Sequence, residues 1–208
     1  MSRHVKIFST LRDRIVYLEY PPGMVLAEKD LCREFRVSRT PLREAIKKLE
    51  SMGLVSVIPR YGTYVSKIDI NDIRCAFEVK IKLEGLAGEI ASRRITPDNL
   101  EKLRAVIESA ENLSENDHER LAQIDAQFHK IIYEAAQNPI LYDTLENLHS
   151  RCARLWISSL EMVVPNAEVV DQLWKIYGAI EDRDSRQAGD LLEFHVKYFI
   201  DKIKDQLL

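Results

Sequence analysis

Three side chains in the C-terminal half could together hold a divalent metal ion. Asp125 and His129 lie four residues apart in IDAQFHK (124–130), so a helix would project both from one face. His195 occurs in LLEFHVKYF, a similarly apolar helical context. One carboxylate and two imidazoles that converge inside a bundle suit Zn, Ni or Mn. Histidines buried in an ordinary core would give the same pattern, so the spacing leaves both interpretations open.

A second group of side chains indicates contact with a polyanion. In VSRTPLREAIKKLESMG (37–53), Arg39, Arg43 and Lys47 follow one another at intervals of four residues. The first two lie in the first two turns of the helix, where the helix dipole disfavours positive charge, and a bound anion would offset that cost. Arg can bind guanine through two hydrogen bonds, while Thr40 could hold a phosphate. A solvated basic face is the alternative.

The elements around this basic run predict a winged helix-turn-helix. Apolar spacing predicts helices over 4–19 and about 27–35, and a third helix that begins after the expected N-cap Ser38. In LVSVIPRYGTYVS (54–66), alternating apolar residues flank turn residues, as in a β-hairpin. The tip of that hairpin, Arg60-Tyr61-Gly62, would supply a second basic contact, with glycine allowing close approach of the backbone to a phosphate.

The remainder of the chain has helical patterning and no strand patterning. Six helices are expected, with Thr96-Pro97 as a cap followed by Pro at the first helical position, and with breaks at NLSEND (112–117) and VVPN (163–166). Their expected ranges are 72–94, 97–113, 119–137, 139–162, 167–182 and 185–206. The fold class is therefore mainly α, with a winged helix-turn-helix over residues 1–67 and an all-helical bundle over residues 68–208.

Charge separates the same two parts. The 208 residues carry a net charge of −3, but residues 1–66 hold 12 basic and 7 acidic residues, whereas residues 67–208 hold 18 and 26. This balance indicates a polyanion-binding module joined to a module with another role. Three separated Cys without a CxxC pattern, the absence of a signal peptide and the absence of a long apolar run predict a cytoplasmic protein.

The stretch LAEKDLCREFRVSRTPLREAIKKLESMGLVSVIPRYGTYV (26–65) closely resembles the DNA-binding domain of the GntR family of bacterial transcription regulators. The resemblance rests on VSRTPLREA, the following LxxxGLV and the Gly-containing wing. It implies a homodimer that binds a palindromic operator in double-stranded DNA. The residues expected to contact DNA are Lys29, Ser38, Arg39, Thr40, Arg43, Arg60, Tyr61 and Gly62.

Residues 72–206 resemble the helical effector domain of the FadR branch of that family, in its six-helix, VanR-like FCD form. LEGLA (83–87), DxxFH (125–129) and the NP at 138–139 carry this likeness. Many members of the branch hold a metal with one Asp and three His, and Asp125, His129 and His195 match three of these positions. The fourth position is Leu173 here. This departure implies either an open coordination position or a site that works without metal.

The same resemblance implies a small carboxylate as effector. Arg151 and Arg154 lie near positions where the family often has Arg facing the cavity, and the planar guanidinium suits a carboxylate. The expected function is a transcriptional regulator, a repressor, controlled by a carboxylate metabolite with or without a bound divalent metal.

Two other functions fit parts of the sequence. A helical metalloenzyme would use Glu115-x-x-His118 and Glu146-x-x-His149, which resemble the Glu-x-x-His pairs of di-iron bundles. The first pair lies in a polar break, and the second is expected on an exposed face, so an enzyme is not predicted. A ligand-independent architectural DNA-binding protein would have no need of the large acidic bundle.

Overall fold

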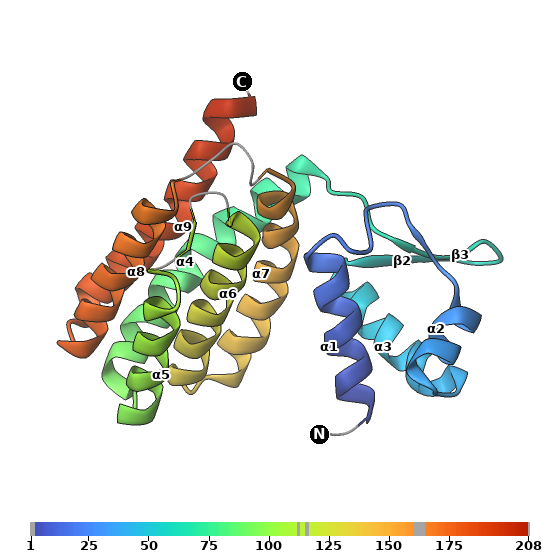
Figure 1. Cartoon of the computed structure of the whole chain (residues 1–208), viewed down its shortest axis with the longest axis horizontal. Coiled ribbons are helices and arrows are strands. Elements are labelled where there is room, and N and C mark those ends of the chain that lie inside the picture. Colours follow the sequence, from blue (N-terminus) through green and yellow to red (C-terminus); the bar gives the residue numbers. More distant parts are fainter. Residues whose placement is uncertain (1–2, 112, 115–116, 160–164, 208) are drawn as a thin grey trace. The chain divides into compact units, whose positions relative to one another are not determined.

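The computed structural model describes residues 3–111, 113–114, 117–159 and 165–207 (Figure 1). The chain forms two compact units. The first contains residues 1–73 together with 150–158, and the second contains residues 74–149 together with 159–208.

The first unit is a winged helix-turn-helix, as the sequence predicts. Three helices come from residues before the hairpin, and a small antiparallel sheet has the strand order β1-β3-β2. In the hairpin, Val57 pairs with Thr63 and Ile58 with Gly62. The two-residue strand β1 was not expected, because it is too short to show alternation. The elements are α1 (Arg3–Val16), β1 (Val25–Leu26), α2 (Glu28–Phe35), α3 (Arg39–Ser51), β2 (Val55–Ile58) and β3 (Gly62–Val65).

The core of the first unit lies between α1 and α3. Leu11 and Ile15 of α1 are fully buried, as are Leu42 and Leu49 of α3. The apolar stripe expected on the third helix is thus confirmed, and the basic residues of α3 remain on its exposed side. Helix α1 ends at Val16, three residues before the expected end, and Leu18 has a left-handed φ of 61° that a helix cannot continue.

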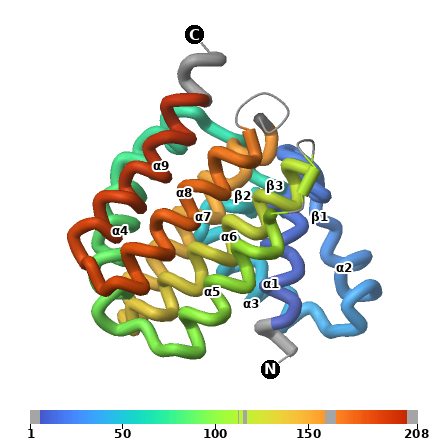
Figure 2. The backbone as a smooth tube through the Cα atoms, turned by 60° about the vertical axis from the view of Figure 1, so that its left-hand side comes forward, coloured from blue at the N-terminus to red at the C-terminus, as the bar shows by residue number. Residues whose placement is uncertain are grey.

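Most of the second unit consists of six helices, and all six match a predicted helix. Figure 2 shows α8 and α9 side by side, and α5 packs against α6. Helix α5 ends at Glu108, before the expected residue 113. The breaks expected at 112–117 and 163–166 lie partly outside the described residues. The helices are α4 (Ile70–Arg94), α5 (Pro97–Glu108), α6 (His118–Ala135), α7 (Pro139–Ser159), α8 (Asn166–Glu181) and α9 (Ser185–Leu207). The first residues of α4 and residues 150–158 of α7 are assigned to the first unit.

Local sequence explains where these helices begin. The Thr96 hydroxyl accepts a hydrogen bond from the Asn99 backbone N–H at 3.3 Å, and Pro97 occupies the first helical position of α5. Ser38 precedes α3 with an extended backbone, but its side chain makes no capping hydrogen bond. In the described part of the chain, every helix is too short or too polar to cross a membrane.

The core of the second unit is mostly apolar, and it contains one cluster of buried ionisable side chains. Leu103, Phe128 and Ile132 are fully buried, as expected for a helical bundle. Charged and ionisable side chains are buried among them, namely Lys80, Glu84, Asp125, His129 and His195. Burial of charge is costly unless each group is paired, so this cluster needs a specific explanation.

Candidate functional site

The residues expected to contact DNA all lie on the surface of the first unit. Arg39 is the first residue of α3, and Arg43 lies one turn later on the same side. All eight candidates are exposed: Lys29, Ser38, Arg39, Thr40, Arg43, Arg60, Tyr61 and Gly62. The start of α3 therefore presents backbone N–H groups and two guanidinium groups to the exterior.

Arg43 has a partner that sequence reasoning missed. Its Nε donates to both carboxylate oxygens of Glu28 on α2, at 3.0 and 3.1 Å. This hydrogen bond raises the pKa of Arg43, whose side chain is still 59% exposed. Glu28 therefore orients the arginine and also competes with any external anion for it.

The backbone conformation of the wing is determined by residues within the hairpin itself. Arg60 and Gly62 have φ of 69° and 122°, and glycine adopts the latter without steric cost. The Tyr61 N–H donates to the Ile58 carbonyl at 3.0 Å, and the Tyr64 hydroxyl donates to the Tyr61 carbonyl at 3.1 Å. These bonds order the hairpin tip while the Tyr61 side chain stays 77% exposed.

In the second unit, the fold brings Asp125 and His129 of α6 together with His195 of α9. The His195 Nε2 lies 2.9 Å from Asp125 Oδ1, and the His129 Nε2 lies 3.7 Å from Asp125 Oδ2. One ligand atom from each residue falls within 4.8 Å of the others. All three side chains are buried, at 3%, 2% and 0% exposure. The three residues singled out by the sequence thus form one cluster.

Glu84 of α4 is the second buried carboxylate of this cluster. It accepts hydrogen bonds from Lys80 Nζ, from the Tyr133 hydroxyl, and from His129 Nδ1 at 3.0 Å. Burial alone would raise the pKa of Glu84, but His129 and Lys80 outweigh burial and hold that pKa well below its usual range. The sequence showed Glu84 only as part of LEGLA, because its neighbours come from elsewhere in the chain.

Hydrogen bonds behind the two imidazoles decide which nitrogen faces Asp125. His129 Nδ1 is engaged by Glu84, so Nε2 points to Asp125. His195 Nδ1 lies 2.8 Å from Gln172 Oε1, and again Nε2 points to Asp125. Partners of this kind fix the orientation of metal-binding imidazoles. Burial would raise the pKa of Asp125, yet His129 and His195 lower it to about 2. Gln172 carried no signal in the sequence.

A third imidazole, that of His149 on α7, adjoins the cluster. Its ring centroid lies 5.7 Å from that of His129. Burial, then the charges of Lys80 and His129, lower the pKa of His149 to about 3, so the ring is neutral. The sequence indicated an exposed face here, and in the structure both Glu146 and His149 are half-buried. Leu173 is fully buried and offers no ligand atom.

Arg151 and Arg154 belong to the first unit, whereas Asp125, His129 and His195 belong to the second. Arg151 Nε donates to the Met52 carbonyl at 2.7 Å, and Arg154 donates to the Ser66 carbonyl. Arg154 is 3% exposed, and its Nε lacks a partner among the described residues. An effector role for these two arginines stays a prediction, and it would require their bonds to backbone carbonyls to open.

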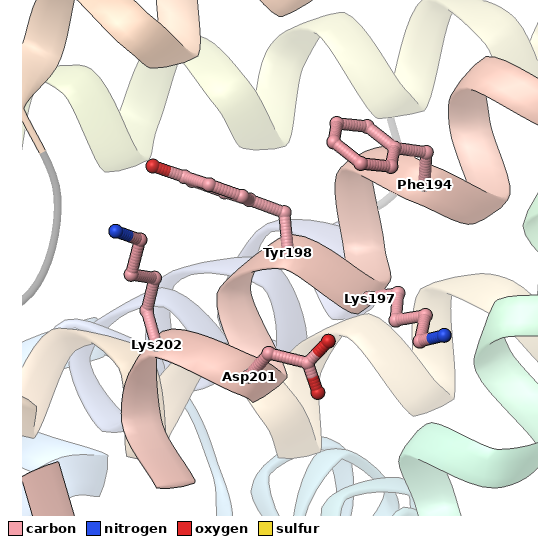
Figure 3. Close-up of a pocket in the computed structure, with 5 residues that line it drawn as sticks. All are labelled: Phe194, Lys197, Tyr198, Asp201 and Lys202. Carbon is pink, nitrogen blue, oxygen red and sulfur yellow. The ribbon is translucent and has the colours of Figure 1, made fainter. Parts of the chain in front are cut away.

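Helix α9 also carries a small surface pocket of about 180 Å³ (Figure 3). Phe194, Lys197, Tyr198, Asp201 and Lys202 line it. The Lys202 ammonium lies 5.3 Å from the centre of the Tyr198 ring, and the Tyr198 hydroxyl donates to Glu168 of α8. Burial and this bond raise the pKa of Tyr198 to about 12. The lining comes from one helix and includes no member of the buried cluster.

Comparison with known proteins decides the family. The bacterial regulatory proteins of the gntR family match residues 4–65, and the FCD domain family matches residues 75–198, more than half of the chain. The chain is a GntR-family regulator with an FCD domain. Its relatives are transcriptional regulators, so this GntR regulator is a DNA-binding regulator and not an enzyme.

Alignments with related regulators cover most of this chain. The HTH-type transcriptional repressor RspR of Escherichia coli is 29% identical over 209 residues, which cover 97% of this chain and 87% of RspR. The HTH-type transcriptional regulator McbR of E. coli is 26% identical over 152 residues, covering 73% and 69%. The structure of E. coli McbR/YncC matches the fold with a TM-score of 0.86 at 22% identity and covers both chains completely.

The motifs that suggested a metalloenzyme do not form a site in the described residues. Glu115 lies outside them, and His118 Nδ1 lies 3.2 Å from Asn166 Oδ1 rather than in the buried cluster. Glu146-x-x-His149 contributes its histidine to the surroundings of His129.

Proposed function

We propose that this GntR regulator is a cytoplasmic homodimeric repressor whose binding to a palindromic operator is controlled by a small carboxylate. Residues 1–67 would bind DNA, and residues 68–208 would bind the effector. The observation that carries this proposal is the exposure of all eight candidate DNA contacts on α2, α3 and the wing. The name of the relative RspR, a repressor, supports the direction of regulation.

The geometry of α3 supports insertion of its first two turns into the major groove. A recognition helix contacts base edges through its N-terminal residues, which is where Arg39, Thr40 and Arg43 lie. The wing would reach the neighbouring DNA phosphates with Arg60, since Gly62 has no side chain and a Cβ at that position would meet nothing within 4 Å. Arg43 would exchange its bond with Glu28 for a base or phosphate contact.

The donor set of the buried cluster fits a divalent metal ion. When a metal ion replaces the proton between His195 Nε2 and Asp125, His129 would donate through Nδ1 to Glu84 and His195 through Nδ1 to Gln172, so both Nε2 atoms would carry lone pairs toward the ion. Three acceptors then converge without a donor between them, and a cation satisfies all three. We propose that Asp125, His129 and His195 hold a Zn, Ni or Mn ion, which would supply positive charge to the interior.

The charges of the cluster support an anionic effector. Lys80, Glu84 and Asp125 sum to −1 when the imidazoles are neutral, and a divalent ion would change that sum to +1. A monocarboxylate would then bring the buried charge to zero, which removes the cost of an unpaired buried charge. A coupling of about 1–3 kcal/mol between effector and operator would be sufficient for regulation.

Selection of duplexes from a randomised pool tests the DNA proposal without knowledge of the operator. The purified protein should enrich a palindromic sequence, and its affinity should fall steeply with salt concentration, as phosphate contacts require. Arg39→Ala should lose this enrichment, whereas Lys102→Ala on the exposed face of α5 should retain it. Failure of the wild type to enrich any sequence would contradict operator binding.

A separate experiment tests the effector. Protein loaded with Zn is screened by thermal shift against small carboxylates and, as controls, the corresponding amides. A carboxylate that raises the melting temperature should also change affinity for the selected duplex. If amides stabilise the protein equally, the charge argument is wrong even where DNA binding is confirmed.

A further inference from the structure

We propose that His149 is a fourth protein ligand of the metal held by Asp125, His129 and His195. The proposal rests on the metal binding proposed above and adds a ligand from a third helix, α7. The ligand set would then contain one carboxylate and three imidazoles, from α6, α7 and α9.

The separation of the imidazole rings supports a shared ion. Two imidazoles that bind one tetrahedral ion through nitrogen at about 2.0–2.1 Å have ring centroids about 5 Å apart. The rings of His129 and His195 are 5.3 Å apart, and those of His129 and His149 are 5.7 Å apart. His149 thus lies at nearly the same distance from His129 as His195, a ligand proposed above.

His149 is also free to turn toward the ion. Among the described residues, neither of its ring nitrogens has a hydrogen-bond partner, whereas Nδ1 of His129 and Nδ1 of His195 are each engaged. As placed, His149 is not among the ligand atoms that lie within 4.8 Å of one another. Coordination by His149 therefore requires its side chain to rotate so that one nitrogen faces the other three ligands.

Three imidazoles and one carboxylate form a nitrogen and oxygen ligand set that suits Zn. Four protein ligands would complete a tetrahedral shell, so the effector carboxylate would be held by the net charge of the cluster rather than at an open coordination position.

Competition with a chromophoric chelator measures the contribution of His149 to Zn affinity. His149→Ala and His149→Gln should each weaken Zn binding by at least about tenfold, the lower range seen when groups around a metal site are removed. His118→Ala is the matched control, because His118 pairs with Asn166 outside the cluster, and its Zn affinity should equal that of the wild type. Circular dichroism of the metal-free proteins confirms that each variant is folded.

The visible spectrum of the Co²⁺-loaded proteins reports the shell itself. The wild type should give the intense bands of a four-coordinate tetrahedral site, and both His149 variants should give a changed spectrum as water enters the shell. Equal Zn affinity and identical Co²⁺ spectra in the wild type and both variants would overturn the role of His149 while leaving the three-ligand site intact. A wild type that binds neither ion would overturn both proposals.

Discussion

The start of α3 and the buried cluster around Asp125 both concentrate charge, but they differ in where the opposite charge lies. Around α3, the candidate side chains are exposed, and Arg43 has one carboxylate partner, Glu28, on a neighbouring helix. In the cluster, Glu84 accepts three hydrogen bonds from within the unit. Exposed charge can remain unpaired until a ligand arrives, whereas buried charge must be neutralised inside the fold. The structure therefore shows the partners of the buried charges directly, whereas the partner of the exposed charges on α3 must come from outside the protein.

Removal of Glu84 should produce the largest effect on stability. Glu84→Ala leaves the Lys80 ammonium, the Tyr133 hydroxyl and His129 Nδ1 without their shared partner inside the core. Breaking a buried ion pair in this way costs about 3–5 kcal/mol in free energy of unfolding. Urea denaturation followed by circular dichroism measures it.

The matched control for Glu84→Ala removes both charges at once. The double variant Lys80→Met/Glu84→Leu removes both members of the ion pair, although the Tyr133 hydroxyl and His129 Nδ1 still lack their acceptor, so it should recover part of the lost stability. If the double variant is as unstable as Glu84→Ala, the loss comes from packing rather than from buried charge, and the contrast between the two regions weakens.

Metal removal should have the next largest effect on stability. The stability lost should be that of the second unit, where the metal is proposed to bind. A free metal concentration one hundred times the dissociation constant stabilises the metal-binding state by about 2.7 kcal/mol. A strong chelator should therefore lower the melting temperature of the wild type. The same chelator should leave the melting temperature of Asp125→Asn unchanged, and an equal shift in both proteins would place the metal elsewhere.

Loss of Arg43 should weaken DNA binding without affecting stability. Arg43→Ala should cost about 1–3 kcal/mol of operator affinity if the side chain binds a base. Glu28→Gln, which releases Arg43 from its carboxylate partner, should instead increase affinity. Titration of the selected duplex by fluorescence anisotropy measures both variants, and opposite signs would confirm that Glu28 competes with DNA for this arginine.

Loss of the side chain before α5 and loss of the side chain before α3 should have smaller and different effects on the free energy of unfolding. Thr96→Ala removes a capping hydrogen bond and should cost about 1 kcal/mol of stability. Ser38→Ala removes a side chain that makes no such bond, so its stability should change little, while a loss of DNA affinity would assign Ser38 to the DNA surface. Thermal unfolding and duplex titration of the same samples separate the two outcomes.

The order and type of the long elements could be predicted because local periodicity determines them. Leu42, Ala45, Ile46 and Leu49 recur at helical spacing, and their burial on α3 follows from that spacing. Thr96-Pro97 likewise predicted the start of α5, because capping and the preference of Pro for the first helical position depend only on neighbouring residues. Strand β1 and the ends of α1 and α5 were missed, because they depend on turn geometry and on pairing with distant residues.

The sequence by itself determined the exposed chemistry of this regulator, since side chains on the polar face of a helix such as α3 remain accessible to solvent. It also indicated Asp125, His129 and His195, because apolar neighbours at helical spacing direct these side chains inward. Only the tertiary structure joined Glu84, Gln172 and His149 to them. These residues come from α4, α8 and α7, and contacts between separate helices arise from packing, which leaves no periodic signal along the chain.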